Sequence, residues 1–183
     1  MSEYRNHLEN YLQGLNIATE VVYDVAGKEL PVDKRVNSWA VDKYDILDLP
    51  EFDFNMDIQP QIDIELQADI VFCLELMEYI YDPVICIKNL WQLLKTDGIL
   101  YITFPTLYPV HNPVESDYLR YTLVGAIKLL HENGFDIEEV TPRKMKQPEL
   151  YNTHVKAEGY KVRGALKTGT LFDAGYIFKA TKI

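Results

Sequence analysis

The fold is decided by residues 68–104, which read ADIVFCLELMEYIYDPVICIKNLWQLLKTDGILYITF. Ala68–Leu74 is a mostly apolar run, as expected of a strand that is buried on both faces. Asp82-Pro83 predicts a helix start, because aspartate accepts bonds from first-turn amides and proline at the first position forfeits no bond. Asp97-Gly98 predicts the end of that helix, and Ile99–Phe104 is a second apolar, β-rich run. This pattern predicts a right-handed unit of two parallel strands joined by a helix, the core of an open α/β sheet.

Weaker patterns predict the elements on either side of this unit. A short amphipathic helix is expected over residues 3–15, and a second helix is expected between a Thr122 cap and Asn133-Gly134. The further strands are expected at Glu20–Val25, Val36–Val41, Asn55–Ile58, Phe135–Val140 and Gly175–Ala180. Residues 141–174 show turn signals but no clear periodicity. The 183 residues show no linker or internal repeat, which indicates a single α/β domain over residues 1–183.

Composition narrows the class of protein. An apolar content of 48% and a charged content of 25% are ordinary for a globular chain. No run approaches the roughly 20 apolar residues of a membrane span, and the N-terminus is too polar for a secretory signal. Cys73 and Cys86 both fall in the predicted core, where we expect free buried thiols and no metal cluster. These features predict a protein of the reducing cytoplasm without a metal site or a membrane partner.

Charge is unevenly distributed along the chain, whose formal net charge is −10. Residues 1–140 contain 9 Lys/Arg and 25 Asp/Glu, whereas residues 141–183 contain 9 Lys/Arg and 3 Asp/Glu. The acidic body argues against general nucleic-acid or anionic-membrane binding, because both require clustered cations. The basic C-terminal portion either offers a local site for an anionic substrate group or complements the acidic body, within one chain or across a homo-oligomer.

At the centre of the chain, residues 69–83 (DIVFCLELMEYIYDP) resemble the fourth-strand region of class I S-adenosylmethionine-dependent methyltransferases. The pattern there is roughly DVVxCxEVLEHVxDP, followed by a helix that ends in LKPGG, where this chain has Leu94–Gly98 (LKTDG). The segment His111-x5-Asp117-Tyr118-x-Arg120-Tyr121-Thr122 resembles a loop of one subset of these enzymes, which often acts on sugars or other small metabolites. The resemblance covers about residues 20–140 and the final strand.

This resemblance implies a specific architecture. The expected fold is a three-layer, Rossmann-like α/β domain with a mostly parallel sheet of about seven strands, the last of them antiparallel. The implied strand order is 3-2-1-4-5-7-6, and the ligand is expected in the crevice at the carboxyl ends of the strands.

The first part of the implied cofactor site follows the first strand. The family pattern is close to D-x-G-x-G-x-G, and this chain offers Asp24-Val-Ala26-Gly27, with a single glycine. Such a turn lets backbone amides approach the cofactor closely. Only about fifteen residues separate Gly27 from Asp42, so the usual first helix must be short or missing. Asp42 is then expected at the end of the second strand, where a carboxylate accepts the two ribose hydroxyls.

The rest of the implied cofactor site follows the third and fourth strands. Asp57-Ile58 matches the acid and apolar pair near the adenine. Leu74-Glu75 would line the methionine and ribose side. For each acid the alternative is a solvated loop carboxylate, a role open to any of the 28 acids in the chain.

The implied substrate side combines an aromatic residue with a polar loop. Tyr79 takes the position where the family commonly has histidine, and His111 is the candidate base because imidazole titrates near neutral pH. Asp117, Tyr118 and Arg120 form a polar cluster in which arginine could grip a carboxylate or a phosphate. The alternatives are a surface histidine without a role and an aspartate–arginine pair that braces the following helix.

The function implied by the resemblance is transfer of a methyl group from S-adenosylmethionine to a small-molecule acceptor, such as a sugar or related metabolite. This reaction is an in-line displacement at a sulfonium methyl, for which the protein mainly positions the nucleophile. One rival is a catalytically inactive methyltransferase-like binding or scaffold protein that has lost cofactor binding, which the single glycine favours. A second rival is an enzyme that binds a nucleoside or nucleotide without methyl transfer.

Overall fold

The computed structural model describes residues 2–58, 67–110, 113–146 and 171–183. Its helices and strands, in chain order, are α1 (Glu3–Gln13), β1 (Asn16–Val25), β2 (Ser38–Leu47), β3 (Ala68–Cys73), α2 (Pro83–Leu93), β4 (Leu94–Pro105), α3 (Leu123–Glu132), β5 (Phe135–Lys146) and β6 (Leu171–Lys182). Short 3₁₀ helices lie at Val32–Lys34 (η1), Met77–Tyr79 (η4) and Val114–Ser116 (η5).

The described strands form one six-stranded sheet in the order β2-β1-β3-β4-β6-β5. β2, β1, β3 and β4 are parallel, and β6 runs antiparallel to both of its neighbours. This is the expected order without its outermost third strand. The prediction of a strand at Asn55–Ile58 is wrong, because Asn55 lies in a turn, Met56 in a bend, and Asp57 and Ile58 in no regular element. A mostly parallel sheet with an antiparallel last strand is confirmed.

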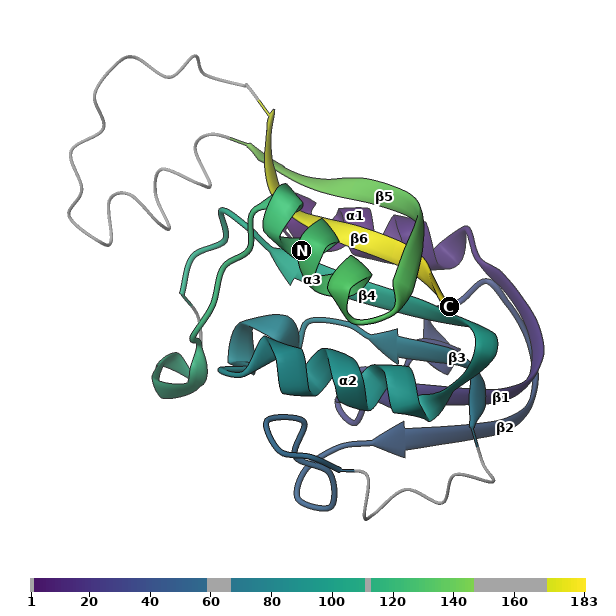
Figure 1. Cartoon of the computed structure of the whole chain (residues 1–183). Coiled ribbons are helices and arrows are strands. Elements are labelled where there is room, and N and C mark those ends of the chain that lie inside the picture. The colour runs from purple at the N-terminus through teal and green to yellow at the C-terminus, as the bar shows by residue number, and fades with distance from the viewer. Residues whose placement is uncertain (1, 59–66, 111–112, 147–170) are drawn as a thin grey trace, which may run out of the picture.

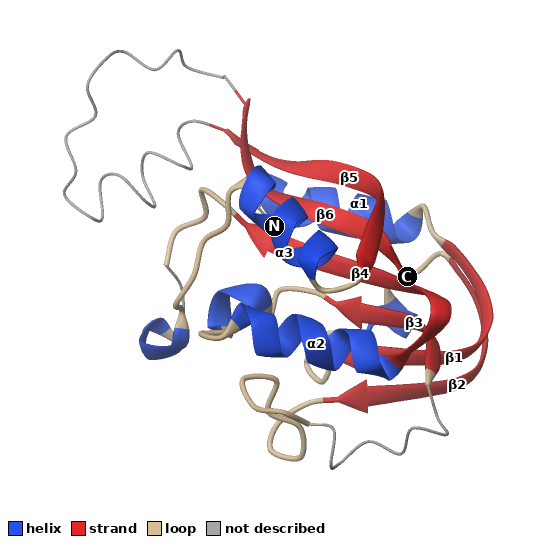
Figure 2. Ribbon diagram, viewed as in Figure 1, coloured by secondary structure: helices blue, strands red, loops and turns tan. Residues whose placement is uncertain are grey.

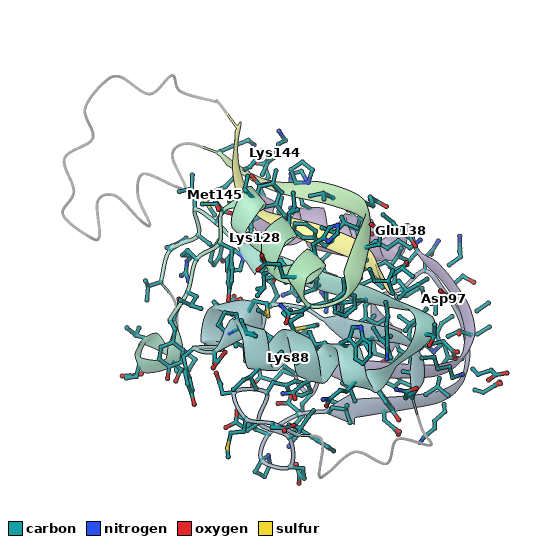
Figure 3. The ribbon with its side chains drawn as sticks, in the orientation of Figure 1. Lys88, Asp97, Lys128, Glu138, Lys144 and Met145 are labelled. Carbon is teal, nitrogen blue, oxygen red and sulfur yellow. The ribbon has the colours of Figure 1, made fainter. Side chains whose placement is uncertain are left out.

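Helices cover both faces of the sheet (Figure 1; Figure 2). α2 and α3 pack on one face through residues that include Leu90 and Leu130, and α1 packs on the other through Leu8 and Leu12. The outer faces of α2 and α3 carry the exposed side chains of Lys88 and Lys128 (Figure 3), together with exposed Val84 and Val124. None of the helices in the described ranges is long and apolar enough to cross a membrane.

The β3–α2–β4 unit follows the sequence pattern except at the end of its helix. The prediction that Asp97-Gly98 ends the helix is wrong, because α2 ends at Leu93 and β4, which begins at Leu94 opposite Ala68, contains both residues. Asp82 caps α2 by accepting a bond from the amide of Ile85 at 3.2 Å, and Pro83 is the first helical residue. Cys73 and Cys86 are free and buried, as expected. The connection between β1 and β2, which is described throughout, contains only the three-residue η1 helix, so the prediction of a short or missing first helix is confirmed.

Five strands are longer than their sequence patterns, and two of them, β1 and β4, begin earlier than expected, at Asn16 and Leu94. β2 continues to Leu47 instead of ending at Val41, β5 continues to Lys146, and β6 begins at Leu171. The extra residues of β2 pair in register with β1 up to Val25 opposite Leu47. β5 and β6 pair with each other along their whole lengths. The extension of β2 moves the carboxyl end of the strand, and with it the residues that reach the crevice.

Candidate functional site

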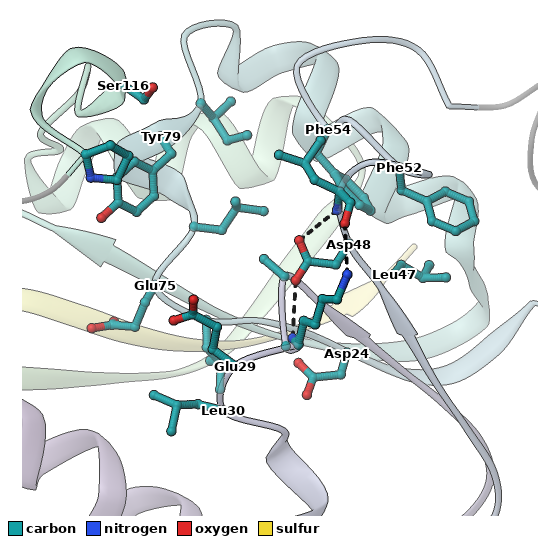
Figure 4. A pocket seen from close by; sticks show the side chains of 18 of the residues that line it. Asp24, Glu29, Leu30, Leu47, Asp48, Phe52, Phe54, Glu75, Tyr79 and Ser116 are labelled. Carbon is teal, nitrogen blue, oxygen red and sulfur yellow. Dashed lines mark hydrogen bonds between the residues drawn. The ribbon is translucent and has the colours of Figure 1, made fainter.

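A cleft of about 1050 Å³ lies at the carboxyl ends of the parallel strands (Figure 4). Val25 pairs with both Leu47 and Cys73, so β1, β2 and β3 end at the same level of the sheet. The segments that follow these strands, the loop after β4 and the first residues of α1 line the cleft. The crevice therefore lies where the sequence predicted it.

The turn after β1 is built around the side chain of Asp24. Asp24 is buried, and its Oδ2 accepts bonds from the amide of Val32 at 2.8 Å and from the hydroxyl of Tyr44 at 2.5 Å. Ala26 adopts a left-handed conformation with φ 59°, in place of one of the family glycines. Gly27 packs directly on the carboxylate, because a Cβ there would lie 2.2 Å from Cγ and Oδ2 of Asp24. The turn thus needs glycine at position 27.

The surroundings of Asp24 raise the pKa of its carboxyl group. Burial raises the pKa of Asp24 to about 6, although the bonds from Tyr44 and Val32 oppose the shift. The folded chain therefore binds this proton more tightly than the unfolded chain. The stability that the group contributes is fully present below about pH 4 and is lost as the pH rises through about 6.

The variant Asp24→Asn should abolish this part of the pH dependence. An amide can still accept the bond from Val32, and it does not ionise. Between about pH 4 and about pH 7.5, the free energy of unfolding of the wild type should fall by about 3 kcal/mol relative to that of the variant. Urea unfolding of both proteins at the two pH values measures this difference. Parallel pH profiles would show that Asp24 titrates normally in the folded protein.

The acid at the end of β2 is Asp48, not Asp42. The expectation that Asp42 ends the second strand is wrong, because Asp42 lies in the middle of β2, where it is exposed and away from the cleft. Asp48 lines the cleft, with Oδ2 accepting from the amide of Lys28 at 3.2 Å and Oδ1 from the amide of Leu49 at 2.7 Å. The Lys28 ammonium donates to the carbonyl of Leu49 at 3.5 Å, which ties the two turns together (Figure 4).

The expected adenine pair is displaced in the same way. Asp57 is exposed and Ile58 is buried in the core, and neither lines the cleft. Phe52, Asp53 and Phe54 line it instead. The sequence pattern gave them no role, because it expected the cofactor contacts in a strand at Asn55–Ile58, which begins just after them.

The residues after β3 lie at the cleft as expected. Leu74 is buried and lines the wall, and Glu75 lines it with a left-handed backbone, φ 58°. The Glu75 carboxylate pairs through both oxygens with the fully buried guanidinium of Arg143 on β5. Thr103 on β4 accepts a bond from the Glu75 amide at 2.8 Å and donates one to its carboxylate at 3.2 Å. Burial favours a raised pKa for Glu75, but the charge and hydrogen bonds of Arg143 outweigh it and hold the pKa below its usual value.

The predicted substrate residues separate into two groups. Tyr79 and Tyr118 line the cleft, whereas Asp117 and Arg120 do not line its described part. Arg120 pairs with Asp117 and donates to the carbonyl of Tyr108 at 2.8 Å, so the pair braces the loop after β4. Burial, with smaller effects from nearby acids, raises the pKa of Tyr79 to about 12, so its phenol stays protonated at neutral pH. His111, the predicted base, lies outside the described residues.

Sequence patterns missed the contribution of α1 to the cleft. Tyr4 and Arg5 of α1 line it, together with Ser2, which caps the helix. Tyr4 is buried between the guanidinium of Arg143, 3.5 Å from its ring centroid, and the ring of Tyr108 at 4.4 Å. A tyrosine and an arginine in an amphipathic pattern gave no signal for this location.

No protein-family model and no curated protein sequence matches the chain. Among solved structures, it resembles a proposed S-adenosylmethionine-dependent methyltransferase from Listeria monocytogenes, with a TM-score of 0.61 and 14% identity over 98% of this chain and 97% of that chain. An S-adenosylmethionine-dependent methyltransferase from Mesorhizobium loti gives a TM-score of 0.57 and 10% identity over 99% and 98% of the two chains. The [4+2]-cyclase SpnF gives 0.58 and 14% over 98% of this chain and 80% of that chain. The chain therefore has the class I α/β fold of S-adenosylmethionine-dependent methyltransferases.

Proposed function

We propose that the cleft binds S-adenosylmethionine and that the protein transfers its methyl group to a small-molecule acceptor, such as a sugar or related metabolite. The observation that supports this most is the placement of Asp48. It brings a carboxylate at the end of the second strand into the same cleft as the Asp24–Gly27 turn and Glu75. Those are three of the four positions at which the resemblance implies contacts with the cofactor.

The residues present fit such a ligand. Each oxygen of Asp48 accepts one backbone bond, which leaves acceptor capacity for a pair of ribose hydroxyls. Phe52 and Phe54 offer apolar surface for an adenine ring at one end of the cleft, and Glu75 lies toward the other end (Figure 4). A cleft of about 1050 Å³ is at the upper limit of ordinary ligand sites, so an acceptor has room beside the cofactor.

The cofactor supplies an electrophilic methyl group, and the chain supplies position and charge. Tyr79 and Tyr118 line the end at which an acceptor would lie, and their phenols are suited to donate hydrogen bonds to it. For a hydroxyl acceptor, we propose that His111 removes the proton. The fold alone does not decide the reaction, since a [4+2]-cyclase has the same architecture.

The test of this proposal compares Asp48, which directly follows β2, with Asp42, which lies in the middle of that strand. Asp48→Ala should weaken binding of S-adenosylmethionine about 100-fold, because a charged acceptor for two hydroxyls is lost. Asp42→Ala is the matched control and should leave affinity unchanged, since Asp42 is exposed in mid-strand. Calorimetric titration with S-adenosylmethionine measures both.

The outcomes separate the proposed function from its rivals. Wild-type protein that shows no binding at millimolar ligand would support the inactive scaffold. Binding of adenosine as tight as that of S-adenosylmethionine would support the nucleoside-binding rival. Equal loss in the two variants would mean that Asp48 has no special role. If binding behaves as expected, formation of S-adenosylhomocysteine with a panel of hydroxyl compounds then identifies the acceptor.

A further inference from the structure

Glu75 is held in place by more contacts than a cleft residue needs for folding alone. Its left-handed backbone is unfavourable for a residue with a side chain and persists only where the surroundings impose it. Thr103 fixes both its amide and its carboxylate, and Arg143 grips both carboxylate oxygens. These contacts come from two strands, β4 and β5, that lie beyond β3 in the sheet. Strained residues that are held in this way gather at ligand sites.

The ion pair is asymmetric across the wall of the cleft. The Arg143 side chain has no exposed surface, whereas that of Glu75 is 28% exposed and lines the cleft. Arg143 Nε also donates to the carbonyl of Tyr4 at 3.3 Å, and its guanidinium packs on the Tyr4 ring. The cation is therefore fixed behind the wall, and the anion forms part of the surface that a ligand meets.

Among the described residues, the hydrogen bonds of Glu75 leave one acceptor position of its carboxylate unused. A carboxylate has about four lone-pair sites. In the described structure Oε1 accepts from Arg143 and Thr103, and Oε2 accepts from Arg143 at 3.0 Å. Oε2 thus retains a site for one more donor. A carboxylate whose other sites are satisfied by fixed partners cannot rotate to find a different bond, so its remaining site has a defined direction.

We propose that Arg143 is a positioning residue that keeps Glu75 ionised and aimed into the cleft, where Glu75 accepts a bond from the ammonium group of a nucleoside-linked amino acid. This inference rests on the proposed function and adds to it a residue that lies outside the cleft, 68 positions along the chain from Glu75. The ligand class is a nucleoside with a cationic amino-acid portion. A nucleoside without the amino-acid portion has no ammonium group to bond with Glu75, so the Glu75–Arg143 pair should not raise its affinity.

The ionisable groups around Glu75 determine the expected pH behaviour. They are Arg143 on β5, Tyr4 and Arg5 on α1, Glu78 and Tyr79 in η4, and Tyr108 after β4. Of these, Arg143 opposes the effect of burial most strongly. Without it, burial dominates, and the Glu75 carboxylate should take up a proton at a higher pH than in the wild type.

The experiment measures how one substitution changes the affinity for two ligands. S-adenosylhomocysteine has the amino-acid portion, and 5′-methylthioadenosine has the same thioether nucleoside without it. Arg143→Met should weaken binding of S-adenosylhomocysteine about tenfold and change that of 5′-methylthioadenosine by less than about twofold. In this variant the affinity for S-adenosylhomocysteine should fall further from about pH 8 to about pH 6, whereas wild-type affinity stays level.

Matched variants keep the test decisive. Lys144→Met makes the same change at the next residue of β5, where the side chain is 39% exposed, and should alter neither affinity. Arg143→Lys keeps the charge but not the two-pronged grip, so we expect a smaller selective loss, and this variant replaces Arg143→Met if the latter does not fold. A folded variant at position 143 with the wild-type ratio of the two affinities overturns the inference alone. Wild-type protein that binds neither ligand overturns both the inference and the proposed function.

Discussion

Gly27→Ala should abolish binding of S-adenosylmethionine and destabilise the protein, which is the largest effect of a single methyl group that we expect in this chain. The new Cβ would lie 2.2 Å from the Asp24 carboxylate, whose partners Val32 and Tyr44 hold it in place. The turn must move outward, away from the position in which Lys28 contacts Asp48. We expect a loss of about 1–3 kcal/mol in the free energy of unfolding. Affinity should fall at least about 100-fold, because the turn and Asp48 bind the ligand together.

The matched control for this change is Gly125→Ala. Gly125 lies in the first turn of α3, where a Cβ would meet only the Thr122 hydroxyl at 3.0 Å. Alanine favours helix over glycine by about 0.5–1 kcal/mol, so stability should be equal or higher and binding unchanged. Urea unfolding and calorimetric titration compare the two variants with the wild type. Wild-type affinity in Gly27→Ala would disprove a rigid turn after β1.

Arg143→Ala should lower the free energy of unfolding by about 3–5 kcal/mol. The substitution removes a fully buried guanidinium and leaves the Glu75 carboxylate without its two bonds. It also removes the cation that packs on the ring of Tyr4 and the donor to the Tyr4 carbonyl, so α1 loses part of its attachment to β5. Chemical unfolding monitored by circular dichroism measures the change.

Two comparisons identify the cause of this loss. Lys144→Ala removes a cation from the same strand, where its pair with Asp173 is half-exposed, and should cost less than about 1 kcal/mol. The double variant Glu75→Gln/Arg143→Met should be more stable than Arg143→Ala, because no uncompensated charge remains and methionine fills the space. A loss in Arg143→Ala no larger than that in Lys144→Ala would show that the buried pair contributes nothing to stability.

Local sequence patterns anticipated the elements whose starts are marked chemically, but not the end of α2, which comes at Leu93 and not at Asp97-Gly98. Asp82 and Pro83 begin α2 where predicted, and the apolar run from Ala68 forms the central strand β3. Both features depend on neighbours within a few residues along the chain, so they can be read directly. The crevice at the carboxyl ends followed from parallel pairing in the same way.

The end of β2 could not be predicted from local sequence patterns. Asp42 and Asp45 interrupt the apolar pattern and resemble the start of a loop, yet both lie within β2. The strand continues because its backbone pairs with β1 as far as Leu47, an interaction between segments about twenty residues apart. A partly exposed strand tolerates polar side chains on its outer face, so composition does not mark its end. This shifts the expected ribose acid from Asp42 to Asp48.

By itself, the sequence determined the class of sheet, the central β3–α2–β4 unit and the edge of the sheet at which a ligand would bind. Only the tertiary structure decided which side chains meet there. Glu75 and Arg143 are 68 positions apart, and Tyr4, in the first turn of α1, contacts Arg143. Periodicity records whether a side chain faces the core or the solvent, but it does not record which distant side chain lies opposite. That pairing depends on the order of strands in the folded sheet, so the charge lining the cleft appears only once the sheet is assembled.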